Sequence, residues 1–343
     1  MDRIIDGIIA RRKAVVAAFL TVAVVCAAMI PFVGVNYDMV DYLPDEAQST
    51  TAVSIMNDEF AQAVPNANVL VHDVGIAQAL ALKHKIAEVE GVEGVMWLDD
   101  VVDVTVPLEM ADASTVETYY RDGAALFQVT VAEGSESTAV PALRALVDEA
   151  GPGNAVSGEA ADTAQTTAST SKEAGGAALI LVPVIILLLV LSTTSWIEPL
   201  LFIAAIGVSI LINMGTNIVL GQVSFITFSV SPILQLAVSL DYAIFLLHAF
   251  AAERQRTPNV ERAMALAMRR SLSTIAASAV TTLFGFAALA FMQFQIGADL
   301  GINLVKGIVF SFFTVMVFLP AVTLSLYKLI DKTRHRPLMP SFK

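Results

Sequence analysis

The chain has 343 residues, of which 56% are hydrophobic and only 15% are charged, against about 25% charged residues in an ordinary soluble domain. Residues 36–173 hold 24 acids and 5 bases, a net charge of −19, whereas the rest of the chain holds 8 acids and 15 bases. This composition argues against a soluble globular enzyme, and the acidic middle argues against a basic nucleic-acid binder. It predicts a membrane protein with one large polar domain and no nucleic-acid partner.

Six mostly uncharged stretches are long enough to cross the bilayer, which takes about 20 residues for about 30 Å of hydrocarbon. The first could instead be a cleaved signal peptide, but it is longer than a signal core of about 7–15 residues, which favours a retained anchor. The predicted spans are Ala14–Val35, Ala174–Leu191, Pro199–Leu220, Ser224–Phe250, Leu272–Phe294 and Gly301–Tyr327.

Basic residues predict the orientation, because they gather on the cytoplasmic side of membrane proteins. They flank the first span, follow the fourth span and follow the sixth span, so six crossings place all three groups on one side. We therefore expect both termini on the cytoplasmic side and residues 36–173 outside. The basic residues are Arg3, Arg11, Arg12 and Lys13, then Arg254, Arg256, Arg262, Arg269 and Arg270, then Lys328, Lys332, Arg334, Arg336 and Lys343. The Arg-rich stretch Glu253–Arg270 looks like an amphipathic helix on the inner membrane surface.

The sequence of the outside domain predicts alternating strands and helices. Apolar alternation and helical spacing indicate strands at Asn68–Asp73, Gly94–Leu98, Ala124–Val131 and Asn154–Ser157, with helices at Ile76–Val89 and Thr138–Ala150. Two such βαβ halves make a split, ferredoxin-like α+β arrangement. Residues 100–122 fit neither half and predict an inserted helix or lobe.

The domain organisation follows from these elements. We expect a cytoplasmic N-terminus and first helix over residues 1–35, and a porter-like domain over 36–173. A bundle of five further helices over 174–327 and a cytoplasmic tail over 328–343 complete the chain. The fold class is thus a six-span helical membrane protein with an extracytoplasmic α+β domain between helices 1 and 2.

Motifs for common enzymatic chemistry are missing from the sequence. The single cysteine, Cys26, excludes an intrachain disulfide and a cysteine zinc site, and its apolar setting predicts a packed thiol. No phosphate-binding loop of the Gly-x-x-x-x-Gly-Lys-Ser/Thr type occurs, and the four histidines are scattered. We expect no cofactor, no metal and no enzymatic activity.

Asp241 is the most informative residue, because a carboxylate inside a spanning helix costs several kcal/mol and commonly marks an ion or proton path. It lies in the fourth predicted span with Ser239 and Tyr242 close by in sequence. Desolvation would bring its protonation nearer to physiological pH. Asp241 is therefore a candidate proton site with Tyr242 and Ser239 as hydrogen-bonding neighbours. The alternative is that Asp241 stays hydrated near the cytoplasmic interface.

Other polar residues in the spans have a structural and a functional interpretation. Ser278, Thr281 and Thr282 in the fifth span suit close helix packing or the lining of a hydrated path beside Asp241. Lys306 in the sixth span could pair with Asp299, extend to the interface or contribute to coupling. The polar residues between the third and fourth spans predict a turn: they are Asn213, Gly215, Asn217, Gly221 and Gln222.

Several motifs occur in order along nearly the whole chain. They are Asp41-Tyr-Leu-Pro44 followed by Phe60, Ser195-Trp-Ile-Glu-Pro199, Asn213-Met-Gly-Thr-Asn217, Leu234–His248, Ser278–Phe286, Gly297-Ala-Asp-Leu-Gly301 and Lys306-Gly307 with Pro320. With the six spans and the large outside domain, they resemble one half of a resistance–nodulation–division (RND) transporter. The local motifs resemble the branch related to the mycobacterial large membrane proteins (MMPL).

The resemblance implies export of lipidic or other amphiphilic molecules, driven by the proton motive force, with Asp241 and Tyr242 matching the family's proton-relay pair. Full-size members carry two such halves, and this chain stops at Pro337–Lys343, about where the first half would end. The implied partners are membrane lipids, an amphiphilic substrate, and a second copy or a separate second-half subunit. A split-gene remnant is the third possibility.

Two other functions share this architecture. Spans two to six also resemble a sterol-sensing-like module, which would make the chain a non-transporting or accessory scaffold. A protein-export accessory subunit would carry an Asn-Asp-Thr run and a following Asp-Arg in the fourth span, and those residues are absent.

Overall fold

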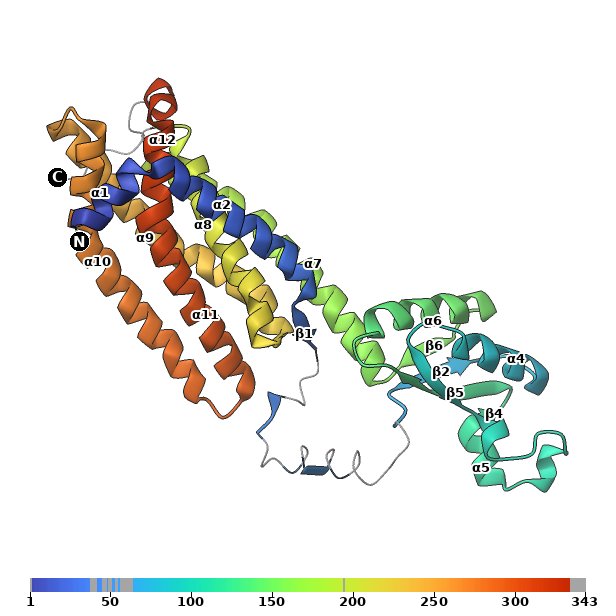
Figure 1. Ribbon diagram of the computed structural model, residues 1–343. Helices are drawn as coiled ribbons and strands as arrows, with labels where there is room; N and C mark the ends of the chain where they lie inside the picture. Colours follow the sequence, from blue (N-terminus) through green and yellow to red (C-terminus); the bar gives the residue numbers. More distant parts are fainter. Residues whose placement is uncertain are drawn as a thin grey trace. The chain divides into compact units, whose positions relative to one another are not determined.

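The computed structural model describes residues 2–37, 42–44, 48, 51, 52, 55, 64–193 and 195–333 (Figure 1). Asp41 and Phe60 of the sequence motifs, and the end of the chain from residue 334, lie outside the described residues. The chain divides into two compact units, which are described separately. Unit 1 comprises Met1–Asn36, Tyr42–Pro44 and Glu173–Lys343, and unit 2 comprises Tyr37–Asp41 and Asp45–Lys172.

Unit 1 is a helical bundle, and the chain enters it for the second time along α7, which begins in unit 2. Its helices are α1 (Asp2–Ala10), α2 (Arg12–Met29), α7 (Glu159–Ser192), α8 (Glu198–Gly215), α9 (Phe225–Arg256), α10 (Val260–Ala287), α11 (Gln295–Phe313) and α12 (Leu319–Lys332). Short 3-10 segments extend three of them, and a π-helical turn joins α11 to α12: these are η1 (Ile30–Phe32), η5 (Thr216–Leu220), η6 (Ala288–Phe291) and η7 (Thr314–Phe318). Two short strands, β1 (Gly34–Asn36) and β7 (Gln222–Ser224), pair in parallel.

The prediction of six spans is confirmed in number. In the described part of the chain, six helical segments are long and apolar enough to cross a membrane. They are Arg12–Phe32, Glu159–Leu191, Glu198–Leu220, Phe225–Arg256, Val260–Phe291 and Gln295–Lys332. The protein is therefore a multi-pass membrane protein.

The connection between α9 and α10 differs from the prediction. Residues Glu253–Arg270 do not form one amphipathic surface helix, because α9 ends at Arg256 and α10 begins at Val260. Asn259 caps α10 by accepting a hydrogen bond from the Arg262 N–H at 3.0 Å. The basic residues thus belong to the ends of two spanning helices, where charged side chains reach water.

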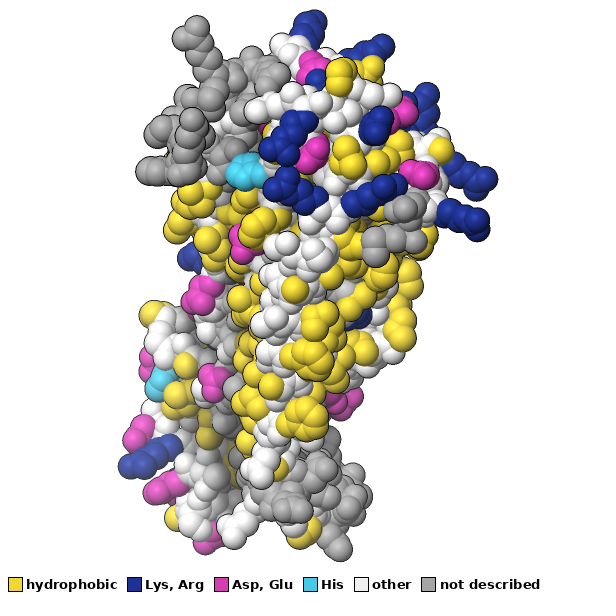
Figure 2. Space-filling model, turned by 90° about the vertical axis from the view of Figure 1, so that its left-hand side faces the viewer, with side chains coloured by type: hydrophobic (Ala, Val, Ile, Leu, Met, Phe, Trp, Pro, Cys, Tyr) yellow, Lys and Arg dark blue, Asp and Glu magenta, His cyan; other side chains and the backbone are white. Residues whose placement is uncertain are grey.

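Two ion pairs bring the basic groups to the same end of unit 1. Arg12 Nη1 lies 2.5 Å from Glu261 Oε1, and Arg254 Nη2 lies 3.1 Å from Asp331 Oδ2. These contacts join the start of α2 to the start of α10, and the end of α9 to the end of α12. Figure 2 shows Lys and Arg side chains gathered at this end, beside a largely apolar surface. The helix ends that carry Arg12, Arg254 and Lys332 therefore lie together, and the tail's other basic residues after Thr333 lie outside the described residues.

Helices α2 and α8 approach each other closely at Cys26 and Gly215. Cys26 is buried and unpaired, as the sequence predicted. A Cβ atom at Gly215 would lie 2.2 Å from the Cys26 carbonyl oxygen, so no larger residue fits without moving a helix. Gly215 is the last residue of α8 and serves close helix packing, which corrects the sequence-based interpretation of it as a turn residue. The predicted turn lies farther on, at Gly221, which has a φ of +80°.

Replacing Gly215 with alanine should destabilise unit 1 by about 1–3 kcal/mol, because overpacking forces the backbones apart. Thermal unfolding of the purified chain in detergent measures the loss. Gly207→Ala on the same helix is the matched control, because a Cβ there meets nothing within 4 Å. Equal melting temperatures for Gly215→Ala and the native chain would contradict the packing argument.

Unit 2 contains an antiparallel sheet with strand order β3-β5-β2-β6, and β4 pairs with β5. Helix α4 connects β2 to β3, and α6 connects β5 to β6. Residues 100–122 contain η4 and α5, which agrees with the expected inserted helix. The elements are β2 (Ala67–Val71), α4 (Ile76–Ala87), β3 (Val92–Met96), η3 (Leu98–Asp100), η4 (Leu108–Met110), α5 (Ala113–Tyr119), β4 (Tyr120–Arg121), β5 (Ala124–Val131), α6 (Glu136–Ala150) and β6 (Ala155–Ser157).

The core of unit 2 follows from period-two burial in the strands, since alternate residues of β5 are buried. Trp97 is fully buried against Phe127, and its indole N–H donates to the Tyr119 carbonyl at 3.1 Å. Beside it, Lys83 Nζ donates to Asp99 Oδ1 at 2.8 Å and to Asp100 Oδ2 at 2.7 Å. Burial alone would raise the pKa of Asp100, but hydrogen bonds from Lys83 and from the Trp97 N–H hold that pKa below its usual value.

A lowered carboxyl pKa stabilises the fold above its usual pKa of about 4, and the contribution disappears as pH falls through the folded-state pKa. Lys83→Met should therefore cost about 1 kcal/mol at neutral pH and progressively less below about pH 4. Urea unfolding followed by Trp97 fluorescence in a Trp196→Phe background measures this difference. Lys85→Met, at an exposed position of the same helix, is the control. A cost that does not change with pH would contradict the assignment.

Candidate functional site

Three spanning helices of unit 1 each carry polar or glycine residues at intervals of four, which places them on one helix face. The three rows are Ser209, Asn213 and Asn217; Ser231, Gln235 and Ser239; and Asn303, Gly307 and Ser311. Every polar side chain in these rows is at most 2% exposed. Helices α8, α9 and α11 pack against one another, so the three rows meet inside the bundle. We call them together the polar network.

Gln235 lies at the centre of the polar network. Its amide oxygen accepts from Asn213 Nδ2 at 3.0 Å, and its amide nitrogen donates to Ser209 Oγ at 2.9 Å and to Ser311 Oγ at 3.1 Å. The same nitrogen lies 3.1 Å from the Gly307 carbonyl oxygen. A Cβ at Gly307 would come within 2.9 Å of Asn213 Nδ2, so glycine leaves the space that the amides occupy.

Lys306 lies at one end of the polar network, on α11. Its ammonium group donates to the Asn213 carbonyl oxygen at 3.1 Å and to Asn217 Oδ1. Asn303 Nδ2 donates to the same Asn217 oxygen at 2.6 Å. Asp299 instead accepts the Ser224 N–H at 2.7 Å, at the start of α9. Lys306 therefore has amide and carbonyl partners inside the bundle, and its interaction with Asp299 is electrostatic rather than a contact ion pair.

Ser239 lies at the other end of the polar network. Its hydroxyl is 2.6 Å from Ser311 Oγ and 2.6 Å from the carbonyl oxygen of Gln235. A hydrogen-bonded series therefore runs from Lys306 through the amides to Ser239, two residues before Asp241. The structure thus connects Ser239 and Lys306, which the sequence selected separately.

Tyr242 lies against α10, whereas Ser239 contacts α11. It is 1% exposed, and its hydroxyl lies beside Ser278 and Thr282 of α10 without meeting hydrogen-bond geometry. The Thr282 hydroxyl donates to the Ser278 carbonyl oxygen at 2.9 Å. Ser278, Thr282 and Tyr242 therefore come together at the contact between α9 and α10.

Asp241 and Thr281 lie on exposed faces of their helices. Thr281 Oγ1 donates to the Ala277 carbonyl oxygen at 2.9 Å. Among the residues that the structure describes, none is in hydrogen-bonding contact with the Asp241 carboxylate. Asp241 is thus outside the polar network, and unit 1 does not itself cover its side chain.

Most of the polar network was not predicted from the sequence. Asn213 and Asn217 were predicted to be turn residues, but Asn213 lies inside α8, and both side chains are fully buried. The sequence feature that could have predicted the polar network is the recurrence of polar residues every four positions in three apolar spans. Charge and turn composition do not detect this recurrence. Among the described residues, no group of three or more His, Cys, Asp or Glu side chains could hold a metal ion.

The fold likeness to solved structures is broad. A crystal structure of SecDF in a super-membrane-facing form gives a TM-score of 0.51 at 13% identity, with 94% of this chain and 39% of that chain covered. SecDF of Thermus thermophilus, a translocon-associated membrane protein, gives a TM-score of 0.52 at 13% identity, with 93% and 38% covered. At 13% identity this likeness is one of fold, and it defines the class as a six-span helical membrane protein.

The family is narrower than that class. Residues 41–336 match the MMPL family, and the chain belongs to this family. A curated membrane protein of Methanocaldococcus jannaschii, MJ1562, is 30% identical over 108 residues, which are 32% of this chain and 26% of the relative. The chain spans about a quarter of that relative and about two fifths of the SecDF chains.

Gln235→Leu should destabilise unit 1 by about 1–3 kcal/mol, because it leaves several buried polar groups without partners. Thermal unfolding in detergent measures the change. Gln255→Leu is the control, because it makes the same substitution at an exposed position of the same helix. If both variants melt together, Gln235 does not hold α8, α9 and α11 in place.

Proposed function

We propose that the chain is a half-size, proton-coupled exporter of lipidic or amphiphilic small molecules. Membership of the MMPL family and the buried polar network in the spanning bundle support a transporter. The observation that carries proton coupling is Asp241, a carboxyl group within a spanning helix on a face that unit 1 leaves uncovered. The proton motive force supplies the energy in this proposal, with no cofactor.

Asp241 takes up and releases the proton, and Tyr242 is its relay partner. A carboxylate at membrane depth is costly when charged, so protonation relieves that cost and ionisation requires a polar partner. Ser278, Thr281 and Thr282 line the proposed path on α10, whereas Ser239 lies on the opposite side of α9 and connects that helix to the polar network. Lys306 acts through the polar network, which ends at Ser239.

A second half completes the site. The exposed face of α9 around Asp241 faces either lipid or another chain, and a polar partner stabilises a charged carboxylate better than lipid does. We propose that a second copy of the chain supplies this partner, which makes the transporter a homodimer. A separate second-half subunit is the alternative.

The proposed location is the bacterial cytoplasmic membrane with both termini inside. The gathering of basic side chains at one end of unit 1 supports this orientation. Unit 2 is then the outside porter domain between the first and second spans. Its strand order and two crossing helices support the ferredoxin-like arrangement expected from the sequence.

Asp241→Asn should abolish proton-driven efflux, because asparagine keeps the shape of aspartate but does not ionise. Tyr242→Phe should slow efflux by about 2- to 10-fold, the equivalent of one hydrogen bond. Proteoliposomes with an imposed pH gradient and an internal pH dye measure proton flux alongside efflux of a fluorescent amphiphile.

Asp331→Asn, the same substitution at the basic end of the bundle, is the control and should transport normally. Undiminished proton flux in Asp241→Asn rules out the relay. Transport by the purified chain alone supports the homodimer, whereas transport only with an added second-half subunit supports the split transporter. A chain that folds and moves neither protons nor amphiphiles in either setting supports the sterol-sensing-like or accessory scaffold.

A further inference from the structure

The junction between α1 and α2 contains three consecutive basic residues. Arg11 separates the two helices with φ −105° and ψ 25°, and Arg12 and Lys13 begin the first span. Helix α1 packs into the core of the bundle through Ile5 and Ile9. This fixes the junction against the bundle instead of leaving it as a free basic terminus.

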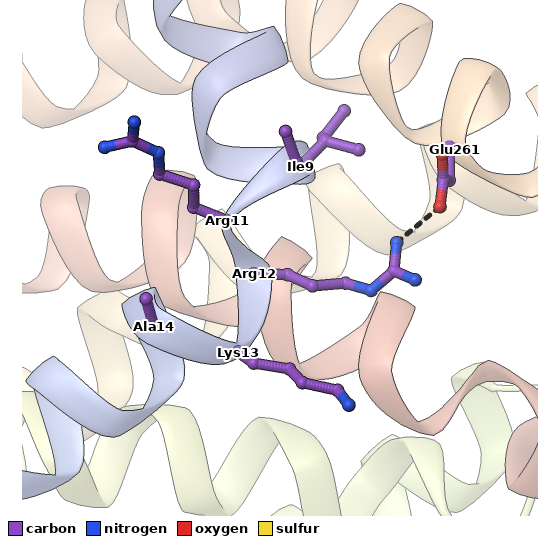
Figure 3. Close-up of a pocket in the computed structure, with 7 residues that line it drawn as sticks. Ile9, Arg11, Arg12, Lys13, Ala14 and Glu261 are labelled. Carbon is purple, nitrogen blue, oxygen red and sulfur yellow. Dashed lines mark hydrogen bonds and ion pairs between the residues drawn. The ribbon is translucent and has the colours of Figure 1, made fainter.

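A pocket of about 500 Å³ opens at this junction (Figure 3). In Figure 3 the side chains of Arg11, Arg12 and Lys13 spread away from the backbone in different directions, and Arg12 reaches Glu261. The lining residues are Ile9, Ala10, Arg11, Arg12, Lys13, Ala14 and Glu261. We call this space the junction pocket.

The junction pocket carries an uncompensated positive charge. Glu261 neutralises Arg12, whereas Arg11 and Lys13 are exposed and make no ion pair within the described part of the chain. The neighbouring pocket shares Glu261 with the junction pocket and sets Asp6 against Arg262 and Arg269, so it has a smaller positive excess. The junction pocket, with three basic residues and Glu261, has an excess of two positive charges.

The junction pocket lies at the membrane boundary. Ala14, which lines it, begins the uncharged part of the first span. Farther along α2, several apolar side chains are exposed, and they are Leu20, Val22, Val24 and Val25. A molecule with a phosphate in the pocket and hydrocarbon chains along α2 would match both surfaces.

We propose that the junction pocket binds the phosphate of an anionic phospholipid headgroup, with the acyl chains beside α2. Guanidinium groups suit phosphate oxygens because they donate hydrogen bonds in a planar fork. Basic pockets at the ends of spanning helices are suited to anionic headgroups. A soluble phosphate would use the same donors but would leave the apolar surface of α2 unused, so the lipid is the occupant that fits. This site is separate from Asp241 and does not depend on the transport proposal.

Native mass spectrometry of the full chain in detergent, titrated with dioleoylphosphatidylglycerol, tests the site. Arg11→Gln with Lys13→Gln should weaken lipid retention by about 25-fold, from about 5-fold for each basic side chain near a headgroup. Glu261→Gln should strengthen it by about 5-fold, because Arg12 is released to the ligand. The stronger lipid retention expected for Glu261→Gln keeps the proposal testable even if the Arg11→Gln, Lys13→Gln double variant folds poorly.

Arg256→Gln with Lys328→Gln is the matched control, because it removes the same charge from the same end outside the junction pocket. Retention within about 2-fold of the native chain supports a specific site, and a loss equal to that of the pocket variant overturns it. Equal retention of zwitterionic dioleoylphosphatidylcholine also overturns the proposal. Equal affinity for glycerophosphoglycerol, the headgroup without acyl chains, replaces the lipid site with a soluble-phosphate site.

Discussion

The structure of the bundle depends on pairing the polar side chains that its helices bury with one another. Eight polar side chains on α8, α9 and α11 are almost completely buried, and each would be costly without a partner. Because each row repeats every four residues, it covers one face of its helix. Turning any of the three helices by one residue, about 100°, would point its row away from the other two. The polar network therefore fixes the rotation of the three helices more specifically than apolar contact can.

The same constraint explains two unusual residues. Glycine at position 307 belongs to the α11 row because the amides of Asn213 and Gln235 occupy the space that a side chain would fill. Lys306, its neighbour, is tolerated inside the bundle because Asn213 and Asn217 supply oxygen acceptors. The buried polar side chains and the close packing of the helices therefore depend on each other.

The spans and most strands of unit 2 could be predicted from the sequence, because long apolar runs and period-two alternation are local properties. The polar network could not be predicted, because the sequence alone does not distinguish a buried asparagine from one in a turn. Asn213 and Asn217 follow Ser209 at intervals of four, but their significance depends on Gln235 and Asn303, which belong to other helices. The prediction of one surface helix over Glu253–Arg270 was wrong for a similar reason. The ends of two spanning helices have the same amino-acid composition as one amphipathic surface helix.

Helix α9 links the polar network to the proposed proton site. Ser239 and Asp241 are two residues apart, which separates them by roughly 200° around the helix. Since Ser239 is held inward by its hydrogen bond to Ser311 of α11, Asp241 is held outward by the same bond. The carboxyl group cannot turn into the bundle without breaking the polar network, so a change in its charge has to be balanced on the outer face. A group that stabilises ionised Asp241 must therefore come from outside unit 1.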